Sequence, residues 1–243
     1  MIIAELNGKI PSKFDDMEDI LTSNVFSFFK YSDRQLFKDY LSKLGIEVTL
    51  KESENAEFIF WPSYEDGTEP DLVVICGNYY LLFEAKLYSD FSLKTSTTES
   101  QIEREIKMGK MSAEYLNKKF VYIALTAEYY KTRSKYQKYK KKDFSFIWTN
   151  WQFISSFIEK KLEYEDMKQN KNFANDLYLL LVKKNLRSFQ SFEQLNYNYN
   201  YNRKYIFFES KTAKFRGKFM GYSDVLSGFL LSSNSNKNIF YKN

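Results

Sequence analysis

Two short segments of the sequence carry residues that could do hydrolytic chemistry together. Pro70-Asp71 opens one apolar run and Glu84-Ala85-Lys86 closes the next, with 12 residues between Asp71 and Glu84. Two carboxylates, helped by the carbonyl of Ala85, can hold Mg²⁺ or Mn²⁺ through oxygen. Such a cation can acidify a water and offset charge on a phosphate under attack. Lys86 can orient or deprotonate that water, or balance charge on the phosphorus.

The two runs have the pattern of a β-hairpin. Residues 71–76 and 79–85 are short apolar segments, and the pair Gly77-Asn78 between them is typical of a two-residue turn. Across such a hairpin, the start of the first strand lies beside the end of the second. Asp71 and Glu84 are therefore expected to meet at one edge of a sheet. Two buried carboxylates in contact disfavour folding unless a cation binds between them.

Side chains alternate along a strand, so Glu84 and Lys86 are expected to project to the same side. A second interpretation needs no chemistry: Glu84 and Lys86 could form a salt bridge at the end of a strand. The histidine count bears on this choice, because the chain contains no histidine. Ser-His-Asp hydrolases, Cys-His proteases and histidine-ligated zinc enzymes are thereby excluded. Any hydrolytic chemistry must use carboxylates, lysine, tyrosine or a metal held by oxygen.

Apolar patterns predict the elements that position the pair. Helical spacing runs from Phe14 to Leu44, as one helix or as two broken near residues 31–33, and Gly45 follows as a stop. The other expected elements are a strand at 57–64, a loop at 89–98, a helix at 99–117, strands at 120–127 and 144–148, and helices at 151–162 and 173–186. This order predicts an α/β fold whose central mixed β-sheet is flanked by helices on both faces. Residues 1–187 are expected to form the main domain, and 188–243 a small C-terminal appendage of unknown structure.

Cysteine use and hydropathy bound the class further. The single cysteine, Cys76, excludes an internal disulfide framework and a multi-cysteine zinc site, and we expect a buried thiol there. No run of 18 apolar residues is present, so a membrane-spanning helix is not expected. The N-terminal residues lack the pattern of a secretory signal, and a cytoplasmic location is the expectation.

Charge is divided unevenly along the chain. Residues 1–110 carry 12 Lys and Arg against 20 Asp and Glu, whereas residues 111–243 carry 24 against 11, so the net charges are −8 and +13. A basic half of this size favours a polyanionic partner, nucleic acid before membrane. The candidate nucleic-acid-binding residues are Lys131, Arg133, Lys135, Lys138, Lys140, Lys141 and Lys142. Tyr129, Tyr130, Tyr136 and Tyr139 are interleaved and could stack on bases, although a solvated helix face or loop is the alternative.

On Pro70-Asp71 and Glu84-Ala85-Lys86, placed on adjacent strands of a hairpin, the sequence resembles the PD-(D/E)XK nuclease superfamily. The resemblance covers roughly residues 14–160 and implies a restriction-endonuclease-like core. In that family an acidic residue on the preceding helix often joins the metal site, and a glutamine on the following helix often assists. Glu18 and Gln101 stand at those places. The implied catalytic residues are Asp71, Glu84, Lys86, Glu18 and Gln101, and the implied metal ligands are Asp71, Glu84, Ala85 and Glu18.

Two of these assignments have competitors in the sequence. Asp16 and Asp19 are close to Glu18, and a carboxylate there could simply complement the helix dipole. Gln101 could be an ordinary polar residue at the start of a helix. Glu5 is a rival acid that stays outside the predicted site.

The expected function is that of a metal-dependent DNA endonuclease that hydrolyses phosphodiester bonds, with DNA favoured over RNA. No domain for reading a target is evident, so a regulatory or targeting protein is an expected partner, and the effector of a phage-defence system is the expected role. A homodimer would be needed to cut both strands together. The alternative is a catalytically inactive subunit that binds nucleic acid or a protein partner.

Overall fold

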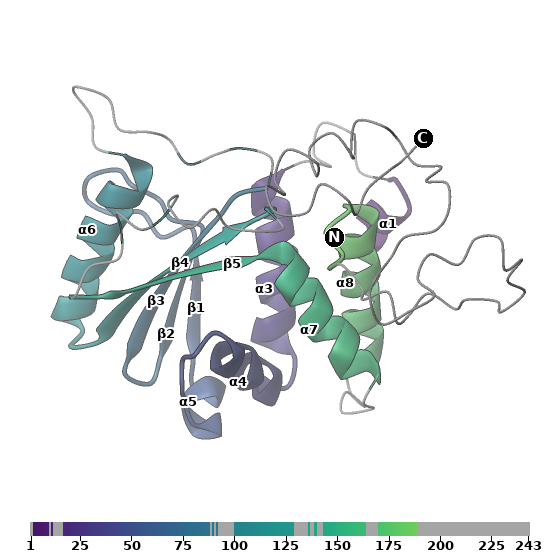
Figure 1. Cartoon of the computed structure of the whole chain (residues 1–243), viewed down its shortest axis with the longest axis horizontal. Coiled ribbons are helices and arrows are strands. Elements are labelled where there is room, and N and C mark those ends of the chain that lie inside the picture. The colour runs from purple at the N-terminus through teal and green to yellow at the C-terminus, as the bar shows by residue number, and fades with distance from the viewer. Residues whose placement is uncertain are drawn as a thin grey trace, which may run out of the picture. The chain divides into compact units, whose positions relative to one another are not determined.

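A computed structural model describes residues 2–9, 11, 17–87, 89, 91, 100–128, 136, 139, 143–163 and 170–188. Over these residues the chain forms a five-stranded mixed β-sheet and seven helices (Figure 1). The strands are β1 (Glu57–Phe60), β2 (Leu72–Cys76), β3 (Tyr79–Ala85), β4 (Lys119–Thr126) and β5 (Ser145–Asn150). The helices are α1 (Ile2–Leu6), α3 (Glu18–Tyr31), α4 (Arg34–Lys43), α5 (Leu50–Glu54), α6 (Gln101–Tyr115), α7 (Trp151–Glu163) and α8 (Lys171–Lys183).

The sheet follows the order of the chain, β1-β2-β3-β4-β5. β1, β2 and β3 are antiparallel neighbours, whereas β4 lies parallel to β3 and β5 lies parallel to β4. The predicted hairpin is present: β2 and β3 pair from Leu72 opposite Phe83 to Cys76 opposite Tyr79, and Gly77 adopts a φ of +54° in the turn. The predicted α/β class with a mixed sheet is therefore confirmed.

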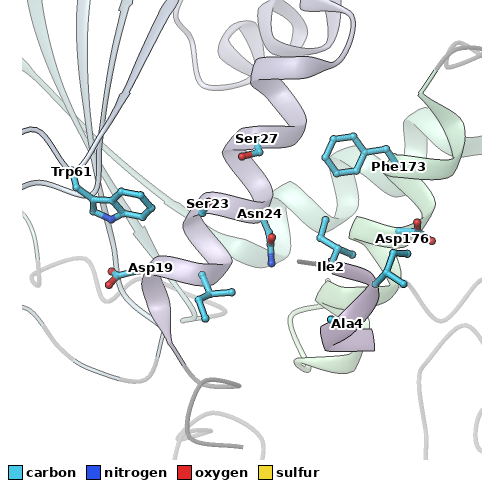
Figure 2. A pocket seen from close by; sticks show the side chains of 11 residues that line it. Ile2, Ala4, Asp19, Ser23, Asn24, Ser27, Trp61, Phe173 and Asp176 are labelled. Carbon is cyan, nitrogen blue, oxygen red and sulfur yellow. The ribbon is translucent and has the colours of Figure 1, made fainter. Parts of the chain in front are cut away.

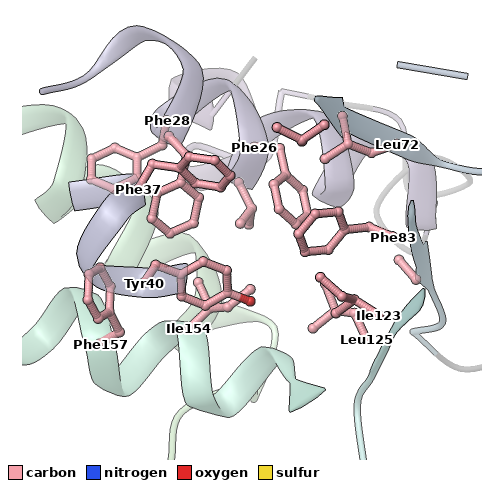
Figure 3. Close-up of a cluster of buried hydrophobic side chains, with 14 of the residues drawn as sticks. Phe26, Phe28, Phe37, Tyr40, Leu72, Phe83, Ile123, Leu125, Ile154 and Phe157 are labelled. Carbon is pink, nitrogen blue, oxygen red and sulfur yellow. The ribbon is translucent and has the colours of Figure 1, made fainter. Parts of the chain in front are cut away.

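Side chains alternate along the strands and build a core on each face of the sheet. Leu81 and Phe83 belong to one cluster, which includes residues of α3, α4, α7 and α8. Figure 3 shows this core, where the rings of Phe26 and Phe83 have centroids 4.8 Å apart. Leu82 and Tyr122 belong to the cluster under α6 on the other face. Figure 1 shows α6 on one side of the sheet and α3 and α7 on the other, so helices flank both faces as predicted.

Helix α6 is fixed at its start and along its length. Ser100 caps it, because its side chain accepts from the backbone N–H of Glu103 while the Glu103 carboxylate accepts from the backbone N–H of Ser100. Such a cap contributes about 1 kcal/mol. At Gly109 an added Cβ would lie 2.6 Å from the Phe120 ring, so only glycine permits this close approach to the sheet. The cap makes Gln101 the first residue of the helix.

The break in the first helical segment was predicted as one of two alternatives, whereas other boundaries differ from the predictions. The helical segment before residue 44 is broken at Ser32-Asp33, where the Asp33 side chain accepts from Gln35 N–H at 2.8 Å and begins α4. The strand expected at 57–64 ends at Phe60, because Trp61 turns the backbone with a φ of +50°. α1 and α5 were not predicted, since five residues are too few to show a helical period.

The chain separates into two compact units, residues 1–189 and residues 190–243, and all described residues belong to the first. The predicted boundary falls between 187 and 188, and the predicted appendage at 188–243 lies outside the described residues except for Ser188. Along the part of the chain that the structure describes, no helix is both long enough and apolar enough to cross a membrane.

Candidate active site

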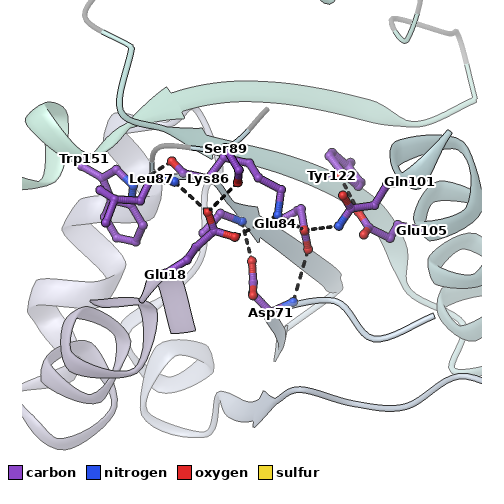
Figure 4. A network of polar contacts seen from close by, with 11 residues as sticks. Glu18, Asp71, Glu84, Lys86, Leu87, Ser89, Gln101, Glu105, Tyr122 and Trp151 are labelled. Atoms are coloured by element: carbon purple, nitrogen blue, oxygen red, sulfur yellow. Dashed lines mark hydrogen bonds and ion pairs between the residues drawn. The ribbon is translucent and has the colours of Figure 1, made fainter. Parts of the chain in front are cut away.

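The hairpin brings Asp71 and Glu84 together at one end of the sheet (Figure 4). Asp71 directly precedes β2, and its backbone N–H lies 3.3 Å from Glu84 Oε2. In return, the backbone N–H of Ala85 donates to Asp71 Oδ2 at 2.7 Å. By strand alternation Asp71 and Glu84 project to the same side as Val73 and Leu82, which face α6. The register of the hairpin thus joins two acids that are far apart in sequence.

Lys86 follows β3 and carries the positive charge of the site. Its ammonium Nζ lies 2.7 Å from Glu84 Oε1 and 2.9 Å from Glu18 Oε1. Its main chain is also held, because Lys86 N–H donates to Leu125 O at 2.7 Å and Trp151 Nε1 donates to Lys86 O at 3.2 Å. The first residue of α7 and the end of β4 therefore fix where the lysine projects.

Glu18 reaches the site from the first turn of α3, as predicted for the acidic residue on the preceding helix. Its carboxylate binds Lys86 Nζ and also accepts from Leu87 N–H at 2.7 Å and from Ser89 Oγ at 3.3 Å. Glu18 is therefore the second carboxylate in an ion pair with Lys86. Of its competitors, Asp19 is exposed and faces a neighbouring pocket, whereas Asp16 lies outside the described residues. The predicted bystander Glu5 is buried against Asn24, at 3.1 Å.

Gln101, at the start of α6, donates a short hydrogen bond from Nε2 to Glu84 Oε1. One oxygen of Glu84 thus accepts from both Gln101 and Lys86. Such donors orient a carboxylate whose other lone pairs are used elsewhere. The structure therefore brings together all five residues that the sequence placed in the site.

Two residues of the network were not predicted. Glu105 lies one helical turn after Gln101 and is 1% exposed, and the Tyr122 hydroxyl donates to Glu105 Oε2 at 2.6 Å. The spacing of four residues from Gln101 was the available signal, because it places both side chains on one face of a helix. Tyr122 gave no signal, since it lies within a continuous apolar run.

Burial and like charge oppose ionisation at this site. Burial, followed by repulsion from Glu84, raises the pKa of Asp71 to about 8. Burial, followed by repulsion from Glu105, raises the pKa of Glu84, and burial raises that of Glu105. Burial disfavours the charge of Lys86, but its contacts with Glu84 and Glu18 outweigh this and raise its pKa. The lysine therefore stays charged while the carboxylates lack sufficient positive charge around them.

The donor set fits a cation that prefers oxygen. Asp71 and Glu84 are 7% and 2% exposed, and a divalent cation between them would relieve the repulsion that raises their pKa values. Mg²⁺ is commonly bound through one or two carboxylates together with water and substrate phosphates. Within the described ranges, no group of three or more His, Cys, Asp or Glu side chains is arranged to hold a metal ion. The fit therefore rests on a pair of carboxylates, with the carbonyl of Ala85 as a predicted further ligand.

The predicted nucleic-acid-binding residues Lys131, Arg133, Lys135, Lys138, Lys140, Lys141 and Lys142 lie outside the described residues. Two of the interleaved tyrosines are described, and for them the prediction of exposed stacking was wrong. Tyr136 and Tyr139 are 2% and 7% exposed, and both rings stack on Phe146 with centroids 5.7 Å apart. Both belong to the core under α6, where each aromatic ring buries a large apolar area.

Comparison with protein-family models, with curated protein sequences and with solved structures finds no match for this chain.

Proposed function

We propose that this chain is a divalent-metal-dependent DNA endonuclease with a restriction-endonuclease-like core. The observation that supports it best is the meeting of Asp71, Glu84 and Lys86 at one end of a hairpin, with Lys86 Nζ 2.7 Å from Glu84 Oε1. A simple salt bridge at a strand end would need neither the buried Asp71 nor the amide of Gln101. Two side chains, Lys86 and Gln101, donate to the buried Glu84 carboxylate, and burying such a group is costly for folding, so a chemical role accounts for it.

Each of these residues would have a separate role in phosphodiester hydrolysis. Asp71 and Glu84 would hold Mg²⁺ or Mn²⁺, which when bound supplies Lewis acidity and offsets charge on the phosphate. Lys86, kept protonated by its carboxylate partners, would orient the attacking water and stabilise negative charge as it develops on the phosphate. Gln101 and Glu18 would hold Glu84 and Lys86 in place. Burial of the pair keeps bulk water away and strengthens each of these interactions.

Supercoiled plasmid offers the direct test. Purified protein is incubated with plasmid and Mg²⁺, Mn²⁺ or EDTA, beside the variants Glu84→Gln and Lys86→Ala. We expect nicked or linear DNA with either metal, none with EDTA, and loss of at least about 100-fold in rate for both variants. Glu114→Gln and Lys107→Ala are matched controls, because both side chains are exposed on the same helix, α6.

The same samples test the alternative function. If wild-type protein shifts the mobility of DNA but never cuts it with either metal, the chain is a binding subunit with a nuclease-like site. Cleavage that persists in Glu84→Gln would show that the metal-binding assignment is wrong. A role as the effector of a defence system, under the control of a partner protein, is part of the proposal and predicts that the partner raises this basal cleavage rate.

A further inference from the structure

A pocket of about 680 Å³ lies beside the candidate active site, between α1, α3, α8 and Trp61 (Figure 2). Its volume is in the range of pockets that take small molecules. The pocket and the site adjoin at two places. Asp19 lines the pocket and directly follows Glu18, and the backbone N–H of Trp61 donates to the carbonyl of Asp71 at 3.1 Å. A group in this pocket would therefore belong to a ligand whose other parts could reach Asp71.

Trp61 combines a rare backbone conformation with an exposed side chain. Its backbone φ is +50°, which bulky residues rarely adopt, and its side chain is 39% exposed. Of the three tryptophans, Trp151 is fully buried and Trp148 is partly buried. Backbone strain of this kind persists where the surrounding structure imposes it, and it concentrates at functional sites. The backbone N–H of Trp61 is bound by Asp71 O, and the Trp61 side chain lines the pocket.

The lining selects the chemistry of the ligand. Among the described lining residues are two carboxylates, Asp19 and Asp176, and no lysine or arginine. A phosphate would be repelled, whereas a neutral flat ring with N–H donors would be attracted. Ser23 and Ser27 follow Asp19 at helical spacing on α3, and their small side chains leave room beside the indole. In Figure 2, Trp61 lies beside α3 at the end that carries Asp19.

We propose that this pocket binds an unpaired nucleobase of the DNA substrate, stacked on Trp61, with guanine favoured by Asp19. This inference rests on the proposed nuclease function. Stacking on an aromatic side chain accepts any base. The edge of an unpaired guanine presents N1–H and the 2-amino group side by side, and these two donors match the two oxygens of one carboxylate. A strand with one base in the pocket would have its backbone beside Asp71 and Glu84, where cleavage is proposed.

Binding can be measured without cleavage, in EDTA, by the quenching of tryptophan fluorescence. The probes are single-stranded 12-mers that are abasic at every position except the central one, which carries guanine, hypoxanthine, which lacks the 2-amino group, or no base. We expect the guanine probe to quench most and to bind most tightly, and the abasic probe to bind most weakly. Trp61→Leu should lower the affinity for the guanine probe by roughly ten-fold or more and remove most of the quenching. Tyr115→Leu, at an aromatic that is 90% exposed on α6, is the matched control and should change neither.

Asp19→Asn is the second variant, and it should fold normally because the side chain is exposed in the first turn of α3. It should abolish the preference for guanine over hypoxanthine and leave stacking intact. Equal binding of abasic and guanine probes, or a guanine preference that survives Asp19→Asn, would overturn the proposal. Plasmid cleavage in the same preparation separates the two ideas. Cleavage without base-dependent quenching overturns only the proposal that the pocket binds a base. Base-dependent quenching without cleavage supports base binding and overturns the proposed nuclease activity.

Discussion

The ammonium of Lys86 lies 2.7 Å from one oxygen of Glu84, and both side chains are buried, with 11% and 2% of their surfaces exposed. An ion pair in such a place is not explained by stability alone, because the cost of removing both charges from water can exceed their attraction. The charges of the pair are also not balanced locally, since the buried carboxyl of Asp71 lies near enough to Glu84 for the two to repel each other when ionised. The arrangement suits a site that receives additional positive charge.

Lys86→Ala should reduce metal-dependent cleavage by at least about 100-fold, because the charge nearest the attacked phosphate is lost. Cleavage is measured by the conversion of supercoiled plasmid at saturating Mg²⁺. Lys86→Arg should recover little of the rate, since the planar guanidinium cannot replace an ammonium packed between Glu84 and Glu18. Full activity of Lys86→Ala would remove the lysine from the mechanism.

Gln101→Ala should act through the metal rather than through the chemical step. Gln101 Nε2 contacts the Glu84 oxygen that also accepts from Lys86, so its loss leaves that carboxylate less well oriented. Removal of such an orienting partner typically costs about 10- to 100-fold in metal affinity or activity. We expect the Mg²⁺ concentration for half-maximal cleavage to rise, with a smaller change in the rate at saturation. An equal loss of rate at every Mg²⁺ concentration would contradict this role, and Glu114→Gln serves as the control.

The sequence predicted the centre of the site because a hairpin makes distant positions neighbours by geometry. Gly77-Asn78 sets the register, and that register places Asp71 beside Glu84. The buried alternation of β3 then determines which side chains face α6. Gln101 was assigned differently, because the resemblance implies a glutamine at the start of the following helix.

Other features depend on tertiary packing, which local patterns encode weakly or not at all. Glu105 looks like one more charge on a helix, yet the close approach at Gly109 buries it against Tyr122. Tyr136 and Tyr139 sit in a basic segment whose composition predicts exposure, but both rings enter the core. Trp61 falls within a predicted strand, yet it has a positive φ and its N–H donates to Asp71, ten positions away.

Tyr122→Phe should destabilise the protein by about 1–3 kcal/mol, because it removes a buried donor to Glu105. Burial raises the pKa of Glu105, so this carboxyl is protonated in acid and ionised at higher pH. A hydrogen bond to the ionised form is stronger. The loss of unfolding free energy, measured in urea, should therefore be larger at pH 8 than at pH 5. Tyr115→Phe, with its exposed hydroxyl, should change stability at neither pH.

The basic segment should contribute to DNA affinity through phosphates. Replacing Lys140, Lys141 and Lys142 with Gln removes up to three contacts, and each contributes about 0.9 to the slope of log affinity against log salt. We expect weaker binding to all sequences and a slope that is shallower by roughly 2 to 3. A control with the same net charge replaces Lys51, Lys107 and Lys171, which are exposed on three different helices. Equal effects of the two triple variants would assign the affinity to net charge alone.

Asp71→Asn should weaken metal binding and raise the stability of the metal-free protein at pH 8. The pKa of Asp71 is raised from 3.8 to about 8 by burial and by Glu84, so the folded state holds a proton that the unfolded state has lost above pH 4. A raised carboxyl pKa stabilises the fold at acidic pH, and this stability is lost as the pH rises through the folded pKa. Between pH 5 and pH 8 in EDTA, the melting temperature of the wild type should therefore fall.

In Asp71→Asn this fall should be smaller, and at pH 8 in EDTA the variant should melt higher than wild type by roughly 5 °C. Mg²⁺ should reverse the order, because it binds the two carboxylates of the wild type and stabilises the folded state by mass action, whereas the variant lacks one ligand. Thermal unfolding of both proteins at pH 5 and pH 8, with EDTA and with Mg²⁺, gives the melting temperatures that test these expectations. A variant that gains as much from Mg²⁺ as wild type does would place the metal away from Asp71.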